Sequence, residues 1–195
     1  MAQSFILASV SPRRKMLLKE TGLDFEVIPS GVHETFRSGE TVHEHVMRLS
    51  REKAGEVSSR RPGSWVLAAD TVVVIDGEVI GKPRTPRDAR MMLTRLSGRE
   101  HTVVTGFTVM HGAGTSCVSD AVESKVLFKT IPDDEIEWYI TTDEPYDKAG
   151  GYAVQGKAAF FIKEIRGSHT NVIGLPLCEV MEALKNAGVV SFQSR

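Results

Sequence analysis

Two adjacent arginines follow a Ser-Pro pair near the start of the chain, in the segment Ser9-Val10-Ser11-Pro12-Arg13-Arg14. Ser suits the N-cap of a helix and Pro its first position, so the segment predicts a strand that runs into a helix. The free N–H groups and the dipole of such a helix start favour an anion, and guanidinium groups add forked donors that fit phosphate. The segment therefore predicts a polyphosphate site. The same residues would also make an ordinary capped helix with solvated arginines.

A carboxylate and a lysine flank a predicted hairpin in the middle of the chain. Asp70 follows the apolar run 65–69 directly and precedes Thr71. Since ligand sites of α/β sheets lie at the carboxyl ends of strands, a carboxylate there can bind a divalent cation or take a proton from water. Lys82 lies in the Gly-Lys-Pro segment that ends the hairpin, and its side chain can point toward a ligand bound at Asp70. An Asp that caps a turn and a solvated Lys are the alternative interpretations.

A glycine-containing loop over residues 147–156 is the third candidate. Its three glycines let the backbone approach a ligand closely, and the amide of Gln155 can pair with the edge of a base. An ordinary flexible turn is the alternative. Glu34 and Lys53 are weaker candidates, because each is a charge in a polar neighbourhood and such charges are usually solvated.

The histidines do not predict a transition-metal site. His43 and His45 are two residues apart on a predicted helix, so they point to different faces, and no His-Glu-x-x-His pattern occurs. A hard cation with oxygen ligands fits the candidate residues better. The sequence also lacks a P-loop and the Gly-x-Ser-x-Gly pattern of an esterase nucleophile.

The chain opens with a predicted strand, helix and second strand, which predicts an α/β fold. The first half predicts strands over 5–8, 25–28 and 65–69, a helix from Pro12 to the Thr21-Gly22 pair, and an amphipathic helix over 42–57. That second helix is predicted to expose Arg48, Arg51 and Lys53. The Asp76-Gly77 pair between apolar runs predicts a two-residue hairpin.

The second half predicts a mixed sheet. A helix begins at Thr85-Pro86 and ends at Ser97-Gly98, with Met91, Met92 and Leu96 toward the core. We predict two antiparallel strands over 101–111 and 117–129, joined by a Gly-containing turn. They are followed by a short helix over 133–139, a loop over 145–151, a strand over 160–165 and a closing helix over 176–187.

Composition limits the partners and the setting of the protein. The chain has 195 residues with 24 Lys and Arg against 25 Asp and Glu, so it has no global field that would attract nucleic acid or an anionic membrane. The two cysteines lack metal or redox spacing, and no signal peptide or membrane span is recognisable. We expect a soluble, reduced, cytoplasmic protein that forms a single domain over residues 1–195.

Six motifs, taken together, resemble Maf proteins in order and spacing over nearly the whole chain. They are Ala8-Ser9-x-Ser11-Pro12-Arg13-Arg14-x-x-Leu17-Leu18, Ala69-Asp70-Thr71, Gly81-Lys82-Pro83, Asp147-Lys148-Ala149-Gly150, Gln155-Gly156 and Val172-Ile173-Gly174-Leu175-Pro176. The resemblance implies an α/β fold related to inosine triphosphate pyrophosphatases, with a mixed, elongated, twisted sheet flanked by helices and two lobes around a central cleft, commonly as a homodimer.

The resemblance also implies hydrolysis of nucleoside triphosphates between the α and β phosphates with a divalent cation, magnesium or manganese. Asp70 resembles the proton acceptor and, with Glu34, a metal-site carboxylate. The implied phosphate contacts are Ser11, Arg13, Arg14, Lys53 and Lys82. Arg13, Thr71 and Gln155 match positions associated with base choice in the branch that acts on dTTP and UTP.

Two alternatives remain at this point. A sister branch of the family prefers 7-methylguanosine triphosphate, and a regulator of septum formation could bind a nucleotide without turnover. The sequence departs from the family at Val10, where a small residue is usual between the two serines. This departure removes no catalytic group.

Overall fold

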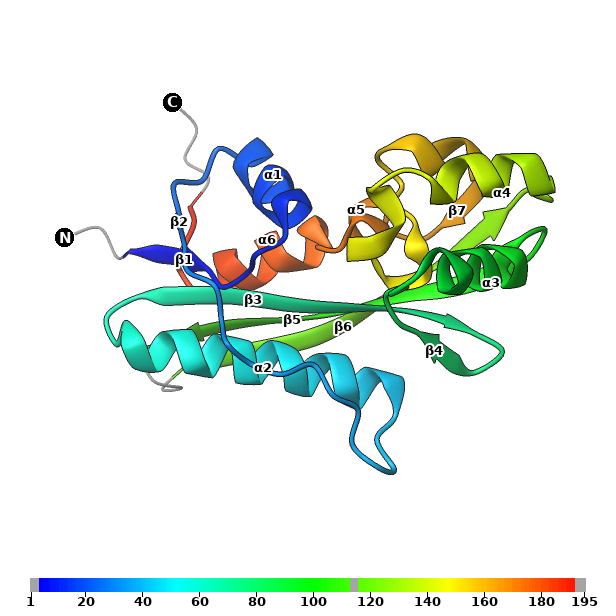
Figure 1. Cartoon of the computed structure of the whole chain (residues 1–195). Coiled ribbons are helices and arrows are strands. Elements are labelled where there is room, and N and C mark those ends of the chain that lie inside the picture. The colour runs from blue at the N-terminus through cyan, green and yellow to red at the C-terminus, as the bar shows by residue number, and fades with distance from the viewer. Residues whose placement is uncertain (1–3, 113–115, 192–195) are drawn as a thin grey trace. The chain divides into compact units, whose positions relative to one another are not determined.

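The computed structural model describes residues 4–112 and 116–191. Helices and strands are interspersed along them (Figure 1). In chain order the elements are β1 (Phe5–Leu7), α1 (Pro12–Glu20), β2 (Glu26–Val27), α2 (Val42–Arg60), β3 (Trp65–Ile75), β4 (Glu78–Ile80), α3 (Pro86–Leu96), β5 (Glu100–His111), β6 (Ser116–Phe128), α4 (Asp133–Ile140), the 3-10 helices η2 (Glu144–Asp147), η3 (Ala149–Gly151) and η4 (Lys157–Phe161), β7 (Ile162–Arg166), α5 (His169–Ile173) and α6 (Leu177–Asn186).

Within the described ranges, seven strands pair into one sheet in the order β2-β1-β3-β5-β6-β7, with β4 on β3. Strand β1 runs parallel to β2 and β3, whereas β4 is antiparallel to β3 and β7 to β6. The predicted mixed α/β sheet is therefore confirmed. The predicted hairpin is also confirmed, because Ile75 pairs with Glu78 around Asp76 and Gly77, which have φ angles of 55° and 75°.

The chain divides into two compact units. The first comprises Met1–Asp70, Thr105–Val122 and Gly174–Arg195, and the second comprises Thr71–Val104 and Glu123–Ile173. Helices α1, α2 and α6 belong to the first unit, and α3, α4 and α5 belong to the second. Strands β3, β5 and β6 contribute residues to both units.

Helix α2 is the main packing element of the first unit. A capping box starts it, because the Thr41 hydroxyl accepts from the Glu44 N–H and the Glu44 carboxylate accepts from the Thr41 N–H. Its apolar side chains at Val46, Leu49, Ala54 and Val57 are all buried. This spacing places them on one face, and the helix lies along the strands (Figure 1).

The prediction that α2 exposes all three of its middle cations is wrong. Arg51 is exposed, but the Arg48 side chain is only 16% exposed and Lys53 is buried. Charge patterning predicted solvation, whereas both side chains lie against carboxylates of other segments. Such partners cannot be recognised from the helix alone.

Gly106 of β5 lies against the backbone of α2, and we predict that Gly106→Ala lowers the free energy of unfolding. A Cβ at Gly106 would lie 2.5 Å from the carbonyl carbon of Val46 and 2.6 Å from its oxygen. We expect a loss of about 2 kcal/mol in urea denaturation, as typical of overpacking. The control is Gly55→Ala in α2, where nothing lies within 4 Å of the added Cβ. It should stabilise the protein by about 0.5 to 1 kcal/mol. Equal stability of Gly106→Ala and the wild type would contradict this close packing.

Helices α3 and α4 and strand β4 surround the core of the second unit. Helix α3 begins after Thr85 as predicted, with a capping box between Thr85 and Asp88, and it buries Ala89, Leu93 and Leu96. Met91 is 54% exposed, so its predicted core position is wrong, and Met92 is partly buried. The buried positions follow the helical period of three and four residues, which Met91 does not share.

Other boundaries differ modestly from the prediction. The loop predicted over 145–151 contains the short helices η2 and η3, and Phe160 lies in η4 rather than in β7. Helix α5 was not predicted. The turn predicted between β5 and β6 includes residues 113–115, which lie outside the described residues. No helix within the described ranges combines the length and apolar character needed to cross a membrane.

Candidate active site

The start of α1 has the structure that the Ser-Pro-Arg-Arg segment predicted. Ser11 is the N-cap and its hydroxyl accepts from the Arg14 N–H at 3.4 Å, with Pro12 at the first helical position. No acidic residue lies in the first turn. Arg13 and Arg14 are both half-buried, so their positive charge concentrates where the helix dipole is also positive. This end of α1 therefore suits an anion.

Arg14 joins two segments of the first unit that are far apart in the sequence. Its Nε donates to the Gly174 carbonyl at 2.7 Å, and its Nη1 donates to the Ser9 hydroxyl at 3.4 Å. Desolvation lowers the pKa of Arg14, while the carboxylates of Asp70 and Glu34 oppose that shift. The guanidinium thus lies in the field of both carboxylates and remains a cation at working pH.

Lys53 of α2 bridges the two carboxylates. Its Nζ donates to Asp70 Oδ1 at 2.7 Å and to Glu34 Oε1 at 2.6 Å. Lys53 and Asp70 are only 6% and 5% exposed, whereas the Glu34 side chain is 46% exposed. A buried ammonium between two carboxylates fixes the direction of the Asp70 side chain and leaves Glu34 accessible to solvent.

Strand and helix packing explains why Lys53 and Asp70 meet. Val66, Ala68 and Asp70 alternate along β3 and so share one face of the strand. Val66 and Ala68 belong to a buried cluster with Ala54 of α2. Lys53 precedes Ala54, so the packing that buries the small apolar side chains also brings its ammonium to Asp70.

The expectation that Asp70 ends a strand is wrong. Strand β3 is continuous from Trp65 to Ile75, and Asp70 lies in its middle. The residues after Asp70 are Thr and Val, which favour extended structure and continue the strand into the hairpin. The carboxylate is therefore held by a rigid strand interior rather than by a loop, and only its polar partners make that position chemically useful.

The second unit brings together two of the motifs that the sequence singled out. The Gly150 N–H donates to the Gly81 carbonyl at 3.0 Å, and a Cβ at Gly151 would lie 3.5 Å from Pro83. Gly150 and Gly151 have φ angles of 70° and 72°, which glycine adopts without strain. The glycine loop thus packs against the turn that carries Lys82, which is exposed.

Gln155 is also exposed, and the backbone that follows it is fixed by contacts with Glu144. The Glu144 carboxylate accepts from the N–H groups of Lys157 and Ala158 at 2.8 and 3.2 Å. Gly156 has a φ of 138°, and a Cβ there would lie 2.6 Å from Glu144. Glu144 was not recognised from the sequence, since it accepts from two backbone N–H groups and from the Tyr139 hydroxyl, and no motif marks these partners.

The structure brings Arg14, Glu34, Lys53 and Asp70 together in the first unit. Thr71, half-buried in β3, belongs to the second unit with Lys82 and Gln155, so their predicted association with Asp70 remains a prediction.

Ser9 and Gly174, which both bond Arg14, lie in motifs that resemble the family, but no individual role was predicted for either residue. Val10 between the serines is 80% exposed and takes no place in the core.

The donors around Lys53 suit a hard cation only in part. Within residues 4–112 and 116–191, no group of three or more His, Cys, Asp or Glu side chains is arranged to hold a metal ion. Asp70 and Glu34 offer two carboxylates near one point, marked by Lys53 Nζ. Magnesium is commonly bound through one or two carboxylates plus substrate phosphates, so this donor set fits a metal that arrives with a polyphosphate.

Comparison with known proteins identifies relatives along almost the whole chain. A family model described as Maf-like protein matches residues 4–187. A protein of Syntrophus aciditrophicus named dTTP/UTP pyrophosphatase is 58% identical over 192 residues, which cover 98% of this chain and 94% of that protein. One of Geotalea uraniireducens with the same name is 49% identical and covers 96% of each chain.

Among solved structures, a HAM1 protein from Coxiella burnetii has a similar fold, with a TM-score of 0.55 and 17% identity over 94% of this chain and 99% of that one. The Ham1 protein of Staphylococcus aureus has a TM-score of 0.51 and 13% identity over 95% of this chain and 100% of that one. These likenesses concern the fold alone and agree with the mixed α/β sheet. The match of the family model and the identity to the two named relatives lead to one conclusion: the chain belongs to the Maf family.

Proposed function

We propose that this chain is a nucleoside triphosphate pyrophosphatase that hydrolyses dTTP, UTP and modified pyrimidine nucleotides to the monophosphate and pyrophosphate. The observation that carries the proposal is the buried Asp70, held by Lys53 beside Glu34 in the unit that contains the arginine-bearing start of α1. The names of relatives that are 58% and 49% identical over nearly the whole chain support the substrate class.

In the proposed reaction, water forms a bond to phosphorus and the bridging P–O bond between the α and β phosphates breaks. Asp70 accepts a proton from the attacking water, and Lys53 keeps the carboxylate oriented. Ser11, Arg13, Arg14, Lys53 and Lys82 are proposed to contact the phosphates. Positioning and charge neutralisation account for most of the catalysis of phosphoryl transfer, so no protein nucleophile is needed.

We further propose that a divalent cation, magnesium or manganese, binds with the substrate. Glu34 and Asp70 would supply its protein oxygens. When bound, such an ion neutralises charge on the phosphate oxygens and polarises the bond that breaks. Glu34 is accessible for this task because its side chain is half exposed, and its ion pair with Lys53 places it near Asp70.

Arg13, Thr71 and Gln155 are proposed to select the base. An amide such as Gln155 offers both a donor and an acceptor, which matches the edge of a pyrimidine. We also propose a homodimer that acts on the nucleotides of the cytoplasm. Analytical ultracentrifugation of the purified chain tests the dimer directly.

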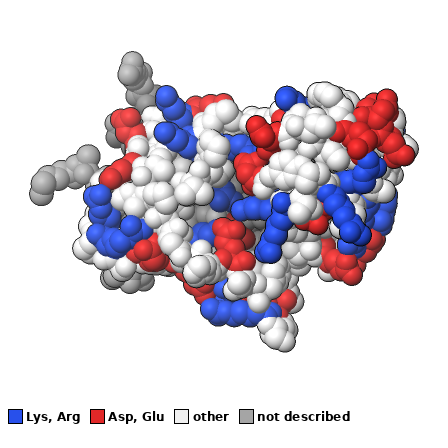
Figure 2. Space-filling view, in the orientation of Figure 1, with Lys and Arg blue, Asp and Glu red and all other residues white. Residues whose placement is uncertain are grey.

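The charge balance of the chain supports a small nucleotide over a polymeric partner. Basic and acidic side chains are interspersed on the face that Figure 2 shows, in line with the formal net charge of −1. A nucleic acid polymer is bound by a continuous basic surface, whereas a single triphosphate needs only a local group of cations.

A substrate panel read by pyrophosphate release tests the proposal. With magnesium or manganese, the purified protein should release pyrophosphate from dTTP, UTP, 5-methyl-UTP and pseudo-UTP at least about tenfold faster, as kcat/KM, than from 7-methyl-GTP, the discrimination expected of base contacts. Preference for 7-methyl-GTP would place the chain in the sister branch. No release from any nucleotide would favour a binding regulator and refute the enzyme.

A further inference from the structure

The loop that carries Glu34 lacks regular secondary structure. We call residues 28–40, between β2 and α2, the Glu34 loop. Its residues from Glu34 to Gly39 are all exposed, and no strand ladder or helix fixes their backbone. A carboxylate on such a loop keeps its place only if other contacts hold the loop.

Four consecutive residues of the Glu34 loop each meet one side chain of α2. Glu34 accepts from Lys53, the Thr35 carbonyl accepts from Arg48 Nη2 at 3.0 Å, and Arg37 Nη2 donates to Glu52 at 2.7 Å. The Phe36 ring stacks on the His45 ring, with centroids 3.4 Å apart and planes within 5°. Positions 45, 48 and 52 are spaced three and four apart, so they form one stripe of the helix.

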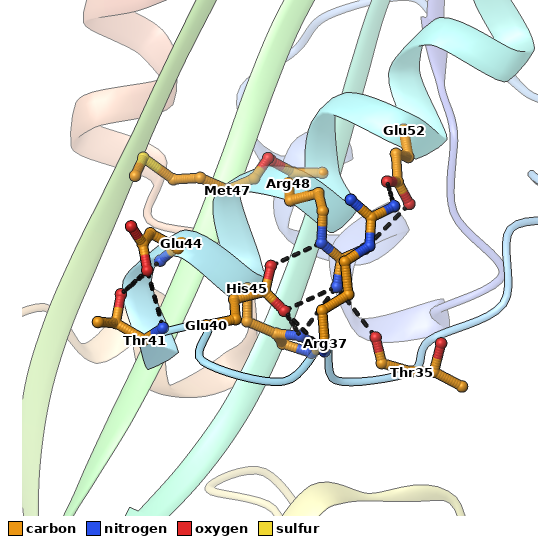
Figure 3. A network of polar contacts seen from close by, with 10 residues as sticks. Thr35, Arg37, Glu40, Thr41, Glu44, His45, Met47, Arg48 and Glu52 are labelled. Carbon is orange, nitrogen blue, oxygen red and sulfur yellow. Dashed lines mark hydrogen bonds and ion pairs between the residues drawn. The ribbon is translucent and has the colours of Figure 1, made fainter.

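Arg48 is the centre of this network (Figure 3). Its Nε and Nη2 grip the Glu40 carboxylate at 2.6 and 2.9 Å, and its Nη1 donates to Glu52 at 3.1 Å. Glu40 closes the loop, because it also accepts from the Arg37 N–H at 3.2 Å. One guanidinium therefore joins the end of the loop, the residue beside Glu34 and the helix.

The environment of Glu40 strengthens its ion pair with Arg48. The Glu40 and Arg48 side chains are only 9% and 16% exposed. The hydrogen bonds from Arg48, followed by those from the Arg37 N–H and His45, lower the pKa of Glu40 to about 2 against the opposing effect of desolvation. The carboxylate is thus ionised at any pH at which the protein would be assayed.

Polar contacts supply much of the interaction between the Glu34 loop and α2. Beside the network lies an open groove of about 480 Å³, whose lining includes Arg37, Glu40, Arg48 and Glu52. Phe36, a large apolar residue of the Glu34 loop, remains 45% exposed although it stacks on His45. The position of the loop therefore depends on the geometry of the Arg48 fork, which a lysine cannot reproduce because it has one nitrogen.

We propose that Arg48, locked by Glu40, is a positioning residue that keeps the Glu34 carboxylate at Lys53 beside Asp70. The inference rests on the proposed function for its effect on turnover. It extends that function by assigning a role to an arginine and a glutamate that touch neither Asp70 nor Lys53 in the described contacts. In this role Arg48 acts only through Glu34, which makes its effect separable from that of a phosphate contact.

A double-mutant cycle tests this role. Arg48→Lys should lower kcat/KM for dTTP and raise the half-saturating manganese concentration, with effects of about 10- to 100-fold, as for residues that orient metal ligands. In a Glu34→Gln background the same substitution should change kcat/KM less than about twofold, since its target is gone. The control is Arg51→Lys on the same helix, whose Nε donates to the Ser119 hydroxyl at 2.9 Å, and it should behave as the wild type.

Hydrogen–deuterium exchange gives a readout that does not depend on turnover. Arg48→Lys should speed amide exchange over residues 34–40, and Arg51→Lys should leave it unchanged. Unchanged exchange in Arg48→Lys, or an equal loss of activity with and without Glu34, would overturn the positioning role. If the wild type releases no pyrophosphate at all, the proposed function fails, while the exchange comparison still decides whether Arg48 anchors the loop.

Discussion

Asp70→Asn is expected to reduce pyrophosphate release from dTTP and UTP by about 10² to 10⁴-fold, the range by which a general base contributes to catalysis. Asn keeps the shape of the side chain and its hydrogen bond to Lys53 but cannot accept a proton from water. The buried position inside β3 and the hydrogen bond from Lys53 fix the side chain at this position in place. Initial rates at saturating substrate and magnesium measure the effect.

A control substitution at a second aspartate of the same hairpin shows whether the loss of activity is specific to the proton acceptor. Asp76 lies in the turn after β3, is exposed and pairs with Arg99 and Arg95. Asp76→Asn tolerates the positive φ of that turn and should retain activity within about twofold of the wild type, as typical of surface positions. Loss of a general base lowers the rate by at least about 10²-fold. If Asp70→Asn kept more than about a tenth of wild-type activity, the loss would be smaller than this, and Asp70 would not be the proton acceptor.

Lys53→Met is expected to lose both stability and activity. Removing one partner from a buried ion pair leaves Asp70 charged and desolvated, which should lower the free energy of unfolding by about 3 kcal/mol. Activity should fall by about 10²-fold, because the carboxylate loses the donor that orients it. Urea denaturation at pH 7.5 and pyrophosphate release measure the two effects.

The stability effect has an internal check. The double variant Lys53→Met with Asp70→Asn should be more stable than Lys53→Met alone, because it removes the unpaired charge. Lys125→Met is the control, since Lys125 is an exposed residue whose ammonium donates to Thr102 at 2.7 Å. It should change stability by less than about 0.5 kcal/mol. A double variant no more stable than Lys53→Met would show that Lys53 and Asp70 are not energetically coupled.

Several elements were predictable because their signals are local. The Ser11-Pro12 cap of α1, the Thr85 and Asp88 capping box of α3 and the Asp76-Gly77 hairpin each depend on a few neighbouring residues. Their side chains hydrogen-bond their own backbone or adopt the required φ. Boundaries were less predictable where the continuation of an element depends on packing, as in β3, which passes through Asp70 without a break.

The sequence by itself determined which chemical groups this protein has and the local structure that carries them: an arginine-bearing helix start, a carboxylate after small apolar residues and a glycine loop. Only the tertiary structure decided that Lys53 is buried between Asp70 and Glu34, that Arg14 bonds Gly174, and that Arg48 anchors the Glu34 loop. These contacts join residues up to 160 positions apart. A charge is solvated or paired according to what packs over it, and the period of a helix or strand does not contain that information.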